Sequence, residues 1–140
     1  ECSIDDFENA KDQTIPWDGV RNYQARNFLR EMAEGDDVFV YHSSCKHIGV
    51  AGIVRVVTSA YPDPTQFRED SPYYDPKSTP EKPRWQAVNM AFEKKLPRLI
   101  PLDEIKSLPG LEGLALIRRG NRLSVMPVTE EQWRIILANA

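Results

Sequence analysis

The chain has 140 residues, of which 41% are hydrophobic and 28% are charged, with a formal net charge of -3. This composition predicts one globular domain without a membrane span, because no run of about 18 apolar residues is present. A protein that binds nucleic acid mainly through phosphates is basic, so the acidic balance excludes charge as the main binding device.

The chain begins at Glu1 and not at a methionine, and we expect residues to be missing from its start. We also expect no basic and apolar leader. Its two cysteines, Cys2 and Cys45, form no disulfide framework and favour a reduced intracellular setting. The segment from Ser3 to Phe7 predicts a short helix, with Ser3 as its cap and acidic residues in its first turn. Ile15 precedes a proline and is expected to be extended.

The stretch from Trp17 to Met32 joins a polar turn, WDGVRN, to an amphipathic helix. The apolar side chains of the helix recur at the i, i+3, i+4, i+7 spacing of one buried stripe: Ala25, Phe28, Leu29 and Met32. Gly35 is the predicted helix stop. A polar turn fixed to a packed helix can hold a ligand rigidly. The alternative is an ordinary helix with a polar N-terminal loop.

Two strands and a long irregular segment follow this helix. Residues 37–43 and 48–57 are apolar and rich in β-branched side chains, which predicts a hairpin of two strands. Gly49 and Gly52 in the second strand indicate a bulge or a close approach of another group to the backbone. Residues 60–83 hold six prolines and four aromatic side chains. We expect an ordered flap there, because disordered tracts have few aromatic residues.

The C-terminal third continues the alternation of short elements. Residues 84–94 predict a third strand, 96–101 an extended segment, 102–107 a short helix and 122–128 a last strand, whereas 111–117 fits either helix or strand. Thr129 and Gln132 have the spacing of a capping box that opens a closing helix, with Trp133, Ile136 and Leu137 toward the core. The predicted fold class is α+β, a curved and mostly antiparallel sheet with short helices at its ends.

Motifs for metals, nucleophiles and phosphates are weak. His42, Cys45 and His47 do not match the usual zinc spacings, and only the distant Cys2 could supply a fourth ligand. A hairpin turn with a buried cysteine is the favoured interpretation, and a Cys–His nucleophile lacks a third orienting group. Gly49 and Gly52 lie inside a strand and form no dinucleotide motif. We therefore expect no metal, no cofactor and no catalytic residue, and a solvated hairpin tip around Arg118, Arg119 and Arg122.

Aromatic residues beside polar ones are the more informative pattern. They lie at turns or strand ends: Trp17, Tyr41, Tyr61, Tyr73, Tyr74 and Trp85. If several converge, they form a flat-walled slot in which a stacked base gains roughly 1–3 kcal/mol. Asp18, Asn22 and Ser43 could then read the edge of the base through hydrogen bonds. The alternative for Tyr41 and Trp85 is an ordinary place in the core.

The sequence resembles the EVE domain family. The motifs that carry the resemblance span nearly the whole chain: WDGVRNYQARNFLR (17–30), VYHS (40–43), AYPDPTQF (60–67), YYDPKS (73–78), PRW (83–85) and RLSVMPV (122–128). The resemblance implies a PUA-like fold, a curved β pseudo-barrel flanked by short helices, in the superfamily that also contains the YTH readers of methylated adenine. It implies one domain over residues 1–140 that lacks the first strand of the family, which ends in a Lys-Ser-Glu-Pro-like motif.

The resemblance also implies a site. Its base pocket comprises the turn and flanking positions Trp17, Asp18, Gly19, Val20, Arg21, Asn22 and Gln24, the strand end Tyr41, His42 and Ser43, and also Tyr74, Trp85 and Ser124. Its phosphate contacts are Arg21, Arg26, Arg30 and Arg122. Local phosphate contacts beside a flipped base are compatible with an acidic protein.

The implied function is a monomeric module that binds nucleic acid carrying a modified base, such as methylated or hydroxymethylated cytosine, without converting it. The implied location is cytoplasmic in a bacterium and nuclear in a eukaryote. Two alternatives stay open. One is a PUA-like hydrolase of an acylated nucleoside, for which the pocket motifs offer no nucleophile and base. The other is a pocket for a small molecule or a protein tail. The sequence does not distinguish DNA from RNA.

Overall fold

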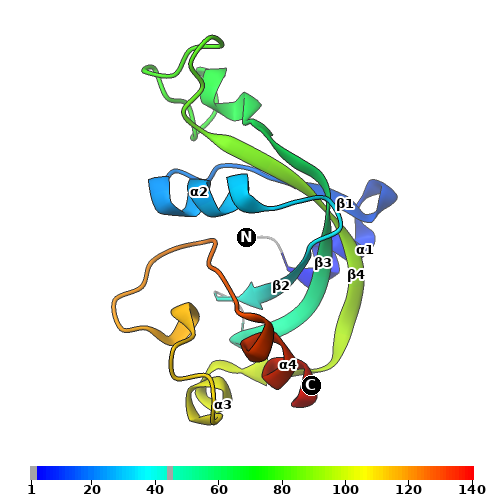
Figure 1. Cartoon of the computed structure of the whole chain (residues 1–140). Helices are drawn as coiled ribbons and strands as arrows, with labels where there is room; N and C mark the ends of the chain where they lie inside the picture. The colour runs from blue at the N-terminus through cyan, green and yellow to red at the C-terminus, as the bar shows by residue number, and fades with distance from the viewer. Residues whose placement is uncertain (1–2, 44–45) are drawn as a thin grey trace.

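The structure, a computed structural model, describes residues 3–43 and 46–140. An antiparallel sheet in the order β1-β4-β3-β2 forms a curved wall through the molecule (Figure 1). Its strands are β1 (Thr14–Trp17), β2 (Asp37–His42), β3 (Gly49–Pro62) and β4 (Gln86–Pro101). The α-helices are α1 (Ile4–Asn9), α2 (Tyr23–Glu31), α3 (Leu102–Ser107) and α4 (Glu130–Ala138). The predicted α+β layout is confirmed.

Short polar side chains set the starts of three helices. Ser3 and Thr129 form complete capping boxes with Asp6 and Gln132, as predicted for α1 and α4. Asn22 caps α2 by accepting a hydrogen bond from the Ala25 N–H. Helix α2 ends at Glu31, earlier than the glycine that was expected to stop it.

Glycines let neighbouring groups reach the backbone of β3, as the sequence predicted. A Cβ on Gly52 would lie 2.3 Å from the Ile4 Cγ1 atom of α1, and one on Gly49 would lie 2.2 Å from the Ile100 carbonyl oxygen. The β3–β4 register shifts between Val50 and Gly52, which marks the expected irregularity. The predicted hairpin of β2 and β3 is confirmed.

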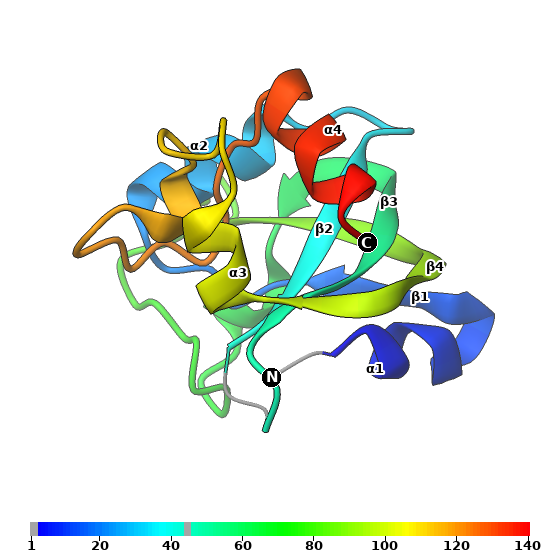
Figure 2. The same cartoon turned by 90° about the horizontal axis from the view of Figure 1, so that it is seen from below.

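Two apolar clusters cover different parts of the sheet. The first joins α1 and α2 to the sheet through Ile4, Phe7, Ala25, Leu29, Val54, Val88 and Met90. The second joins α3 and α4 to the ends of β3 and β4 through Val50, Ile53, Leu96, Ile100, Ile105, Leu111, Leu114 and Ile136. Figures 1 and 2 show α2 and α4 within the curve of the sheet and α1 outside it. The site described below lies at the end of the sheet that the first cluster supports.

Several predicted element bounds were wrong. Strand β3 runs past residue 57 through residues that are half-buried or exposed. Strand β4 runs past residue 94 through the buried Leu96 and Ile100, so it includes the segment 96–101 that was expected only to be extended. Residues 111–117 contain only a short 3-10 turn, Ala115–Ile117. Ile15 and Pro16, expected only to be extended, belong to β1, which pairs with β4.

The predicted last strand, residues 122–128, is not a strand. A strand needs a neighbouring ladder, and a hollow of about 310 Å³ separates Val125–Val128 from Val38 and Phe39 of β2. Phe28, Met32 and Trp133 also line this hollow.

In the described part of the chain, no helix has the length and apolar character needed to cross a bilayer.

Residues 63–85, which we call the flap, leave the sheet between β3 and β4 and extend from one end of it (Figure 1). The flap begins with a 3-10 turn, Pro64–Phe67, capped by Asp63. Its first three predicted residues, 60–62, belong instead to β3. The expectation of an ordered flap is confirmed, because its side chains and backbone are hydrogen-bonded to one another and to the β1–α2 turn.

Candidate nucleic-acid interface

The turn from Trp17 to Asn22 links β1 to α2 and contacts the flap directly. Gly19 has a φ of +74°, a left-handed conformation that favours glycine, and a Cβ there would lie 2.8 Å from the Tyr73 ring. Val20 is buried in the first cluster. The sequence W-D-G-V-R-N therefore gives a turn that is held at its centre by the flap and at its end by the helix cap.

A buried ion pair connects this turn to the base of the flap. The Arg21 Nη1 atom lies 3.0 Å from Oδ2 of Asp63, whose side chain is completely buried. Asp63 also accepts hydrogen bonds from the Gly19 N–H at 2.9 Å and from the N–H and hydroxyl of Thr65 at 2.8 and 2.6 Å. Burial alone would raise the pKa of Asp63, but the hydrogen bonds from Thr65, Gly19 and Arg21 outweigh it and hold the pKa below its ordinary value.

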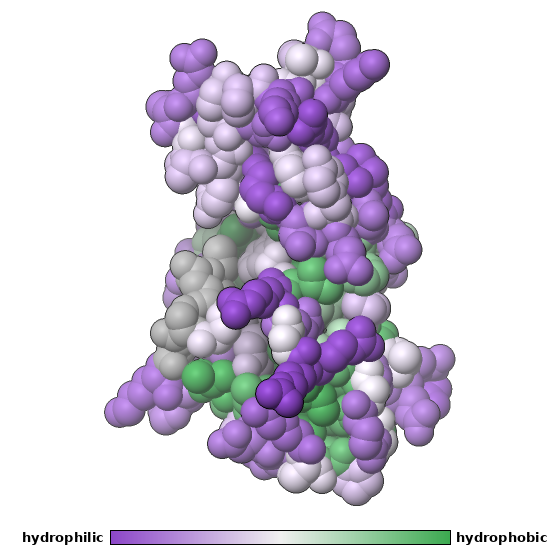
Figure 3. All heavy atoms as spheres, turned by 90° about the vertical axis from the view of Figure 1, so that its left-hand side faces the viewer, coloured by the Kyte–Doolittle hydropathy of each residue, from purple (hydrophilic) through white to green (hydrophobic). Residues whose placement is uncertain are grey.

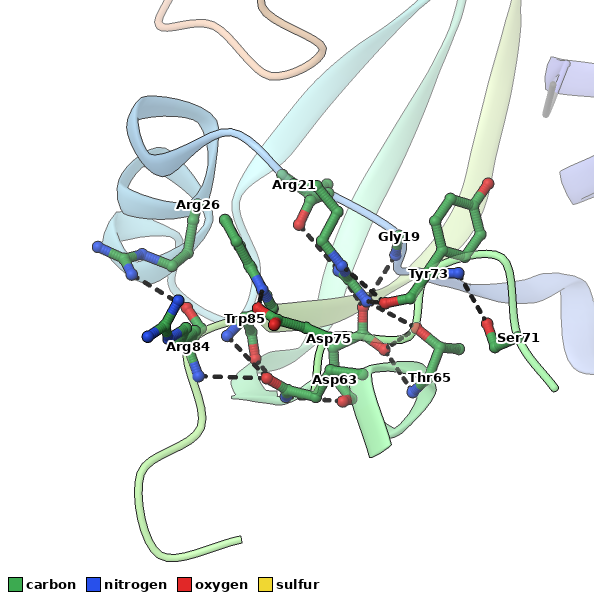
Figure 4. Close-up of polar contacts among 12 residues, drawn as sticks. Gly19, Arg21, Arg26, Asp63, Thr65, Ser71, Tyr73, Asp75, Arg84 and Trp85 are labelled. Atoms are coloured by element: carbon green, nitrogen blue, oxygen red, sulfur yellow. Dashed lines mark hydrogen bonds and ion pairs between the residues drawn. The ribbon is translucent and has the colours of Figure 1, made fainter. Parts of the chain in front are cut away.

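All five N–H donors of the Arg21 guanidinium make hydrogen bonds inside the protein (Figure 4). Two reach the Tyr73 carbonyl oxygen at 3.0 and 2.7 Å, and the others reach Val20, Asp63 and Thr65. Because Tyr73 lies in the flap, Arg21 holds both the root and the tip of that segment.

Gln66 and Asp75 fasten the rest of the flap. The buried Gln66 amide donates to the carbonyl oxygens of Asp63 and Trp85 and accepts from the N–H groups of Arg84 and Trp85. The Trp85 indole N–H donates to Oδ2 of Asp75 at 2.7 Å. This hydrogen bond is the largest cause that lowers the pKa of Asp75. The flap is thus anchored by polar groups rather than by an apolar core of its own.

Aromatic rings and guanidinium groups alternate across the flap and the start of α2. The Arg21 guanidinium lies over the rings of Tyr73 and Trp85, at 5.6 and 5.4 Å from their centroids. Trp85 stacks on Tyr23 at 4.9 Å, and the Arg26 guanidinium lies 4.7 Å from the Tyr23 centroid. Protein groups therefore pack against the Trp85 ring, and Trp85 is only 6% exposed.

The structure brings some of the predicted base-pocket residues together at the turn. Trp17 is partly buried against the first cluster, and Asp18 is exposed beside it. Burial, followed by the charge of Asp63, raises the pKa of Asp18. Gln24 is exposed on the first turn of α2, and Tyr74 is exposed at the tip of the flap. Asn22 uses its side-chain oxygen as a helix cap.

The other predicted pocket residues have different surroundings. Tyr41 packs against the second apolar cluster. The His42 Nε2 atom accepts a hydrogen bond from the Ile4 N–H at 3.1 Å. Ser43 and Ser124 are exposed, at the end of β2 and in the irregular segment that precedes α4. The hollow beside β2 is lined by none of the predicted pocket residues.

Cationic side chains lie near the stacked rings. The Arg26 Nη1 atom donates to the Arg84 carbonyl oxygen at 3.0 Å, and Arg30 is exposed one turn further along α2. No carboxylate lies within ion-pair distance of Arg26, Arg30 or Arg84 among residues 3–43 and 46–140. The exposed Arg122 lies in the segment before α4. Figure 3 shows mostly hydrophilic residues at the flap end and hydrophobic residues gathered below them.

Cys2 and Cys45, which entered the zinc hypothesis, lie outside the described residues. Within the described residues, no group of three or more histidine, cysteine or acidic side chains could hold a metal ion.

Sequence reasoning missed the residues that organise this interface, namely Tyr23, Asp63, Thr65, Gln66 and Asp75. One signal was available, because Asp followed by Pro and Thr is typical of a capped turn. Nothing in the sequence paired Asp63 with Arg21, since the two residues are 42 positions apart.

A curved antiparallel sheet with short helices and a polar turn at one end defines a PUA-like α+β module. The chain belongs to the EVE domain family, whose model matches residues 1–139. It is 44% identical over 144 residues to human thymocyte nuclear protein 1, an alignment that covers 97% of this chain and 64% of that protein. The chain therefore spans a little under two thirds of the length of this curated relative.

Two solved structures extend the comparison. A protein of Pseudomonas putida is 50% identical with a TM-score of 0.92, covering 97% of this chain and 90% of the other. The human THYN1 protein in complex with 5-methylcytosine-containing DNA is 44% identical with a TM-score of 0.94, covering 99% of this chain and 85% of the other. The predicted family and PUA-like fold are confirmed.

Proposed function

We propose that this protein binds nucleic acid that carries a modified cytosine and reads the modified base at the Trp17–Asn22 turn. The observation that carries the proposal is its similarity, over almost the whole chain, to a human protein crystallised with 5-methylcytosine-containing DNA. A base that leaves its stack can be read by stacking and by hydrogen bonds to its edge. A turn fixed by a helix cap and a buried ion pair offers the rigid surface that such reading needs.

The chemistry of the exposed turn residues supports cytosine as the base. Asp18 presents a carboxylate, and a carboxylate accepts a hydrogen bond from the N4 amino group of cytosine. Trp17 and Tyr74 supply aromatic surface at the turn and at the flap tip. The other residues of the predicted base pocket would lie beside the base or support the residues that contact it.

Arg26, Arg30 and Arg122 are the proposed phosphate contacts. Arg26 and Arg30 have no carboxylate partner among the described residues, so their charge is available to a nucleic-acid backbone. A binding role is favoured over catalysis by the similarity to a protein that was crystallised in complex with DNA.

A binding titration tests the proposal. Matched single-stranded and double-stranded DNA and RNA oligonucleotides would carry cytosine, 5-methylcytosine or 5-hydroxymethylcytosine at one position. We expect tighter binding of one modified form, and a loss of about tenfold or more in that affinity with Trp17→Ala, because one base stack is removed. Asp18→Asn is expected to weaken binding of the modified base without unfolding the protein.

Free nucleosides in the same titration separate this function from that of a small-molecule pocket. Equal affinity for modified and unmodified oligonucleotides, with no effect of Trp17→Ala, would contradict the proposal. Arg55→Ala, at an exposed position of β3, is the control for the loss of a positive charge away from the turn.

A further inference from the structure

Arg21 cannot serve as an ordinary phosphate contact in the conformation that the structure shows. A guanidinium group has five N–H donors, and each of the five makes a hydrogen bond to the protein. Its charge faces the fully buried Asp63 carboxylate. A phosphate oxygen would have to displace one of these acceptors, and weakening the contact with the fully buried Asp63 carboxylate is costly.

The acceptors of Arg21 belong to the two segments that make the proposed base site. Val20 is in the turn, Asp63 and Thr65 are at the root of the flap, and Tyr73 is next to its exposed tip. The Asp63 carboxylate in turn accepts from Gly19 in the turn. Arg21 therefore links the turn to three residues of the flap: it forms an ion pair with Asp63 and hydrogen bonds to Thr65 and Tyr73.

The ring of Tyr73 shows how closely this distance is set. It lies against Gly19 so tightly that a Cβ would come within 2.8 Å of the ring, while its carbonyl oxygen accepts two hydrogen bonds from Arg21. The neighbouring Tyr74 is 38% exposed. Tyr73, the residue before Tyr74, is held by its contact with Gly19 and by its hydrogen bonds from Arg21. If these contacts were lost, the flap could rotate and the exposed Tyr74 ring would move relative to Trp17.

We propose that Arg21 and Asp63 are positioning residues that set the discrimination between modified and unmodified bases, without touching the nucleic acid. The inference rests on the proposed function of the turn as a base reader. A modification such as a methyl group is recognised by the shape of its surroundings. The position of the flap should therefore affect the difference in affinity between modified and unmodified bases more than it affects the attraction to the phosphate backbone.

The test measures two quantities for each variant. The first is the ratio of the dissociation constants for unmodified and modified oligonucleotides. The second is the slope of log Kd against log salt concentration, which falls by about one when one phosphate contact is lost. Arg21→Lys keeps the positive charge but has too few donors for the five acceptor contacts. We expect the ratio to fall by about tenfold with an unchanged salt slope.

Thr65→Val is the gentler variant, since it keeps both charges and removes only the hydroxyl between them. It is expected to lower the ratio in the same direction by a smaller factor. Arg30→Ala should do the opposite, with a lower salt slope and an unchanged ratio. Arg55→Lys, in an exposed ion pair with Glu93 on the sheet, is the matched control that should change neither quantity.

Amide hydrogen exchange of the flap in the free protein gives a readout that needs no ligand. Faster exchange across residues 63–85 in Arg21→Lys, but not in Arg55→Lys, is expected. A selective wild-type protein with an unchanged ratio in both Arg21→Lys and Thr65→Val overturns this inference alone. A wild-type protein without any preference overturns the proposed function and this inference together.

Discussion

Gly19 illustrates how one backbone conformation joins two segments that are far apart in the sequence. Its φ of +74° aims its N–H at the Asp63 carboxylate, and its missing side chain leaves room for the Tyr73 ring. Either requirement alone would favour glycine, and here both act at the same residue. The turn therefore depends on Gly19 for its shape and for its contact with the flap.

Gly19→Ala is expected to lower stability by more than the backbone conformation alone explains. A left-handed residue with a side chain costs about 1–2 kcal/mol, and displacement of the Tyr73 ring adds to that cost. Chemical unfolding followed by fluorescence measures the change. Gly120→Ala is the matched control, because Gly120 has a φ of +77° and a Cβ added there would meet no atom within 4 Å. Equal losses for the two variants would show that the Tyr73 contact contributes nothing.

The sequence predicted the turn but not its partners. The pattern W-D-G-V-R-N ahead of an amphipathic stripe was visible because a turn and a helix are local features. The role of Asp63 depends on a contact across 42 residues, and a lone aspartate before a proline has many possible uses. The family resemblance implied a phosphate contact for Arg21, whereas all five donors of its guanidinium group make hydrogen bonds inside the protein.

At the scale of elements, the flap is held by polar side chains that replace a regular ladder. Gln66 is fully buried, and its amide satisfies two backbone N–H groups and two backbone carbonyl oxygens. A buried amide with every hydrogen bond made acts as a rigid connector between segments. Gln66 thus does for the flap what strand pairing does for β3 and β4.

Gln66→Ala should lower the free energy of unfolding substantially, although the flap lies at the end of the sheet. The change leaves the buried Trp85 N–H without its partner and removes one of the hydrogen bonds that the carbonyl oxygens of Asp63 and Trp85 accept. A buried group left unpaired costs about 1–3 kcal/mol. We expect a total loss of about 2–4 kcal/mol, reduced where water enters the space. Gln24→Ala, at an exposed position of α2, is the control and should change stability by less than about 0.5 kcal/mol. A loss no larger than that of the control would contradict the connector role.

Element lengths were less predictable than element types. The apolar runs identified β2 and β3 correctly, but β3 extends into residues 58–62, none of which is buried. Residues 122–128 show the reverse case. They have the composition of a strand, yet a hollow lies between Val125–Val128 and β2, so no ladder forms. Strand propensity is a preference of side chains, and pairing decides whether a strand exists.

The whole molecule has two ends that are stabilised by different forces. At the flap end, the ionised carboxylates of Asp63 and Asp75 accept hydrogen bonds that lower the pKa of each. At the other end, α3 and α4 close over an apolar cluster that includes Ile100, Ile105 and Ile136. Acid should therefore act on the two ends unequally.

We expect the flap end to loosen first as the pH falls. A carboxyl group whose pKa is lowered by folding stabilises the protein fully above its ordinary pKa, which is 3.8 for aspartate, and this stability is lost as the pH falls toward the lowered value. Hydrogen exchange at pH 3 and pH 6, corrected for intrinsic rates, should show greater loss of protection in residues 63–85 than in 102–138. In Asp63→Asn, the flap amides should be less protected from exchange at pH 6, and their protection should differ less between pH 6 and pH 3. Equal loss at both ends would contradict this expectation.

The placement of the three tryptophans gives the molecule a built-in set of optical reporters. Trp17 lies at the turn, Trp85 at the end of the flap stacks on Tyr23, and Trp133 of α4 stacks on Phe39 of β2. The emission of each indole depends on its own local surroundings, so variants that keep one tryptophan at a time would report separately on ligand contact, flap closure and packing of the opposite end. Three single-tryptophan variants would then follow three places in the same fold without an attached dye.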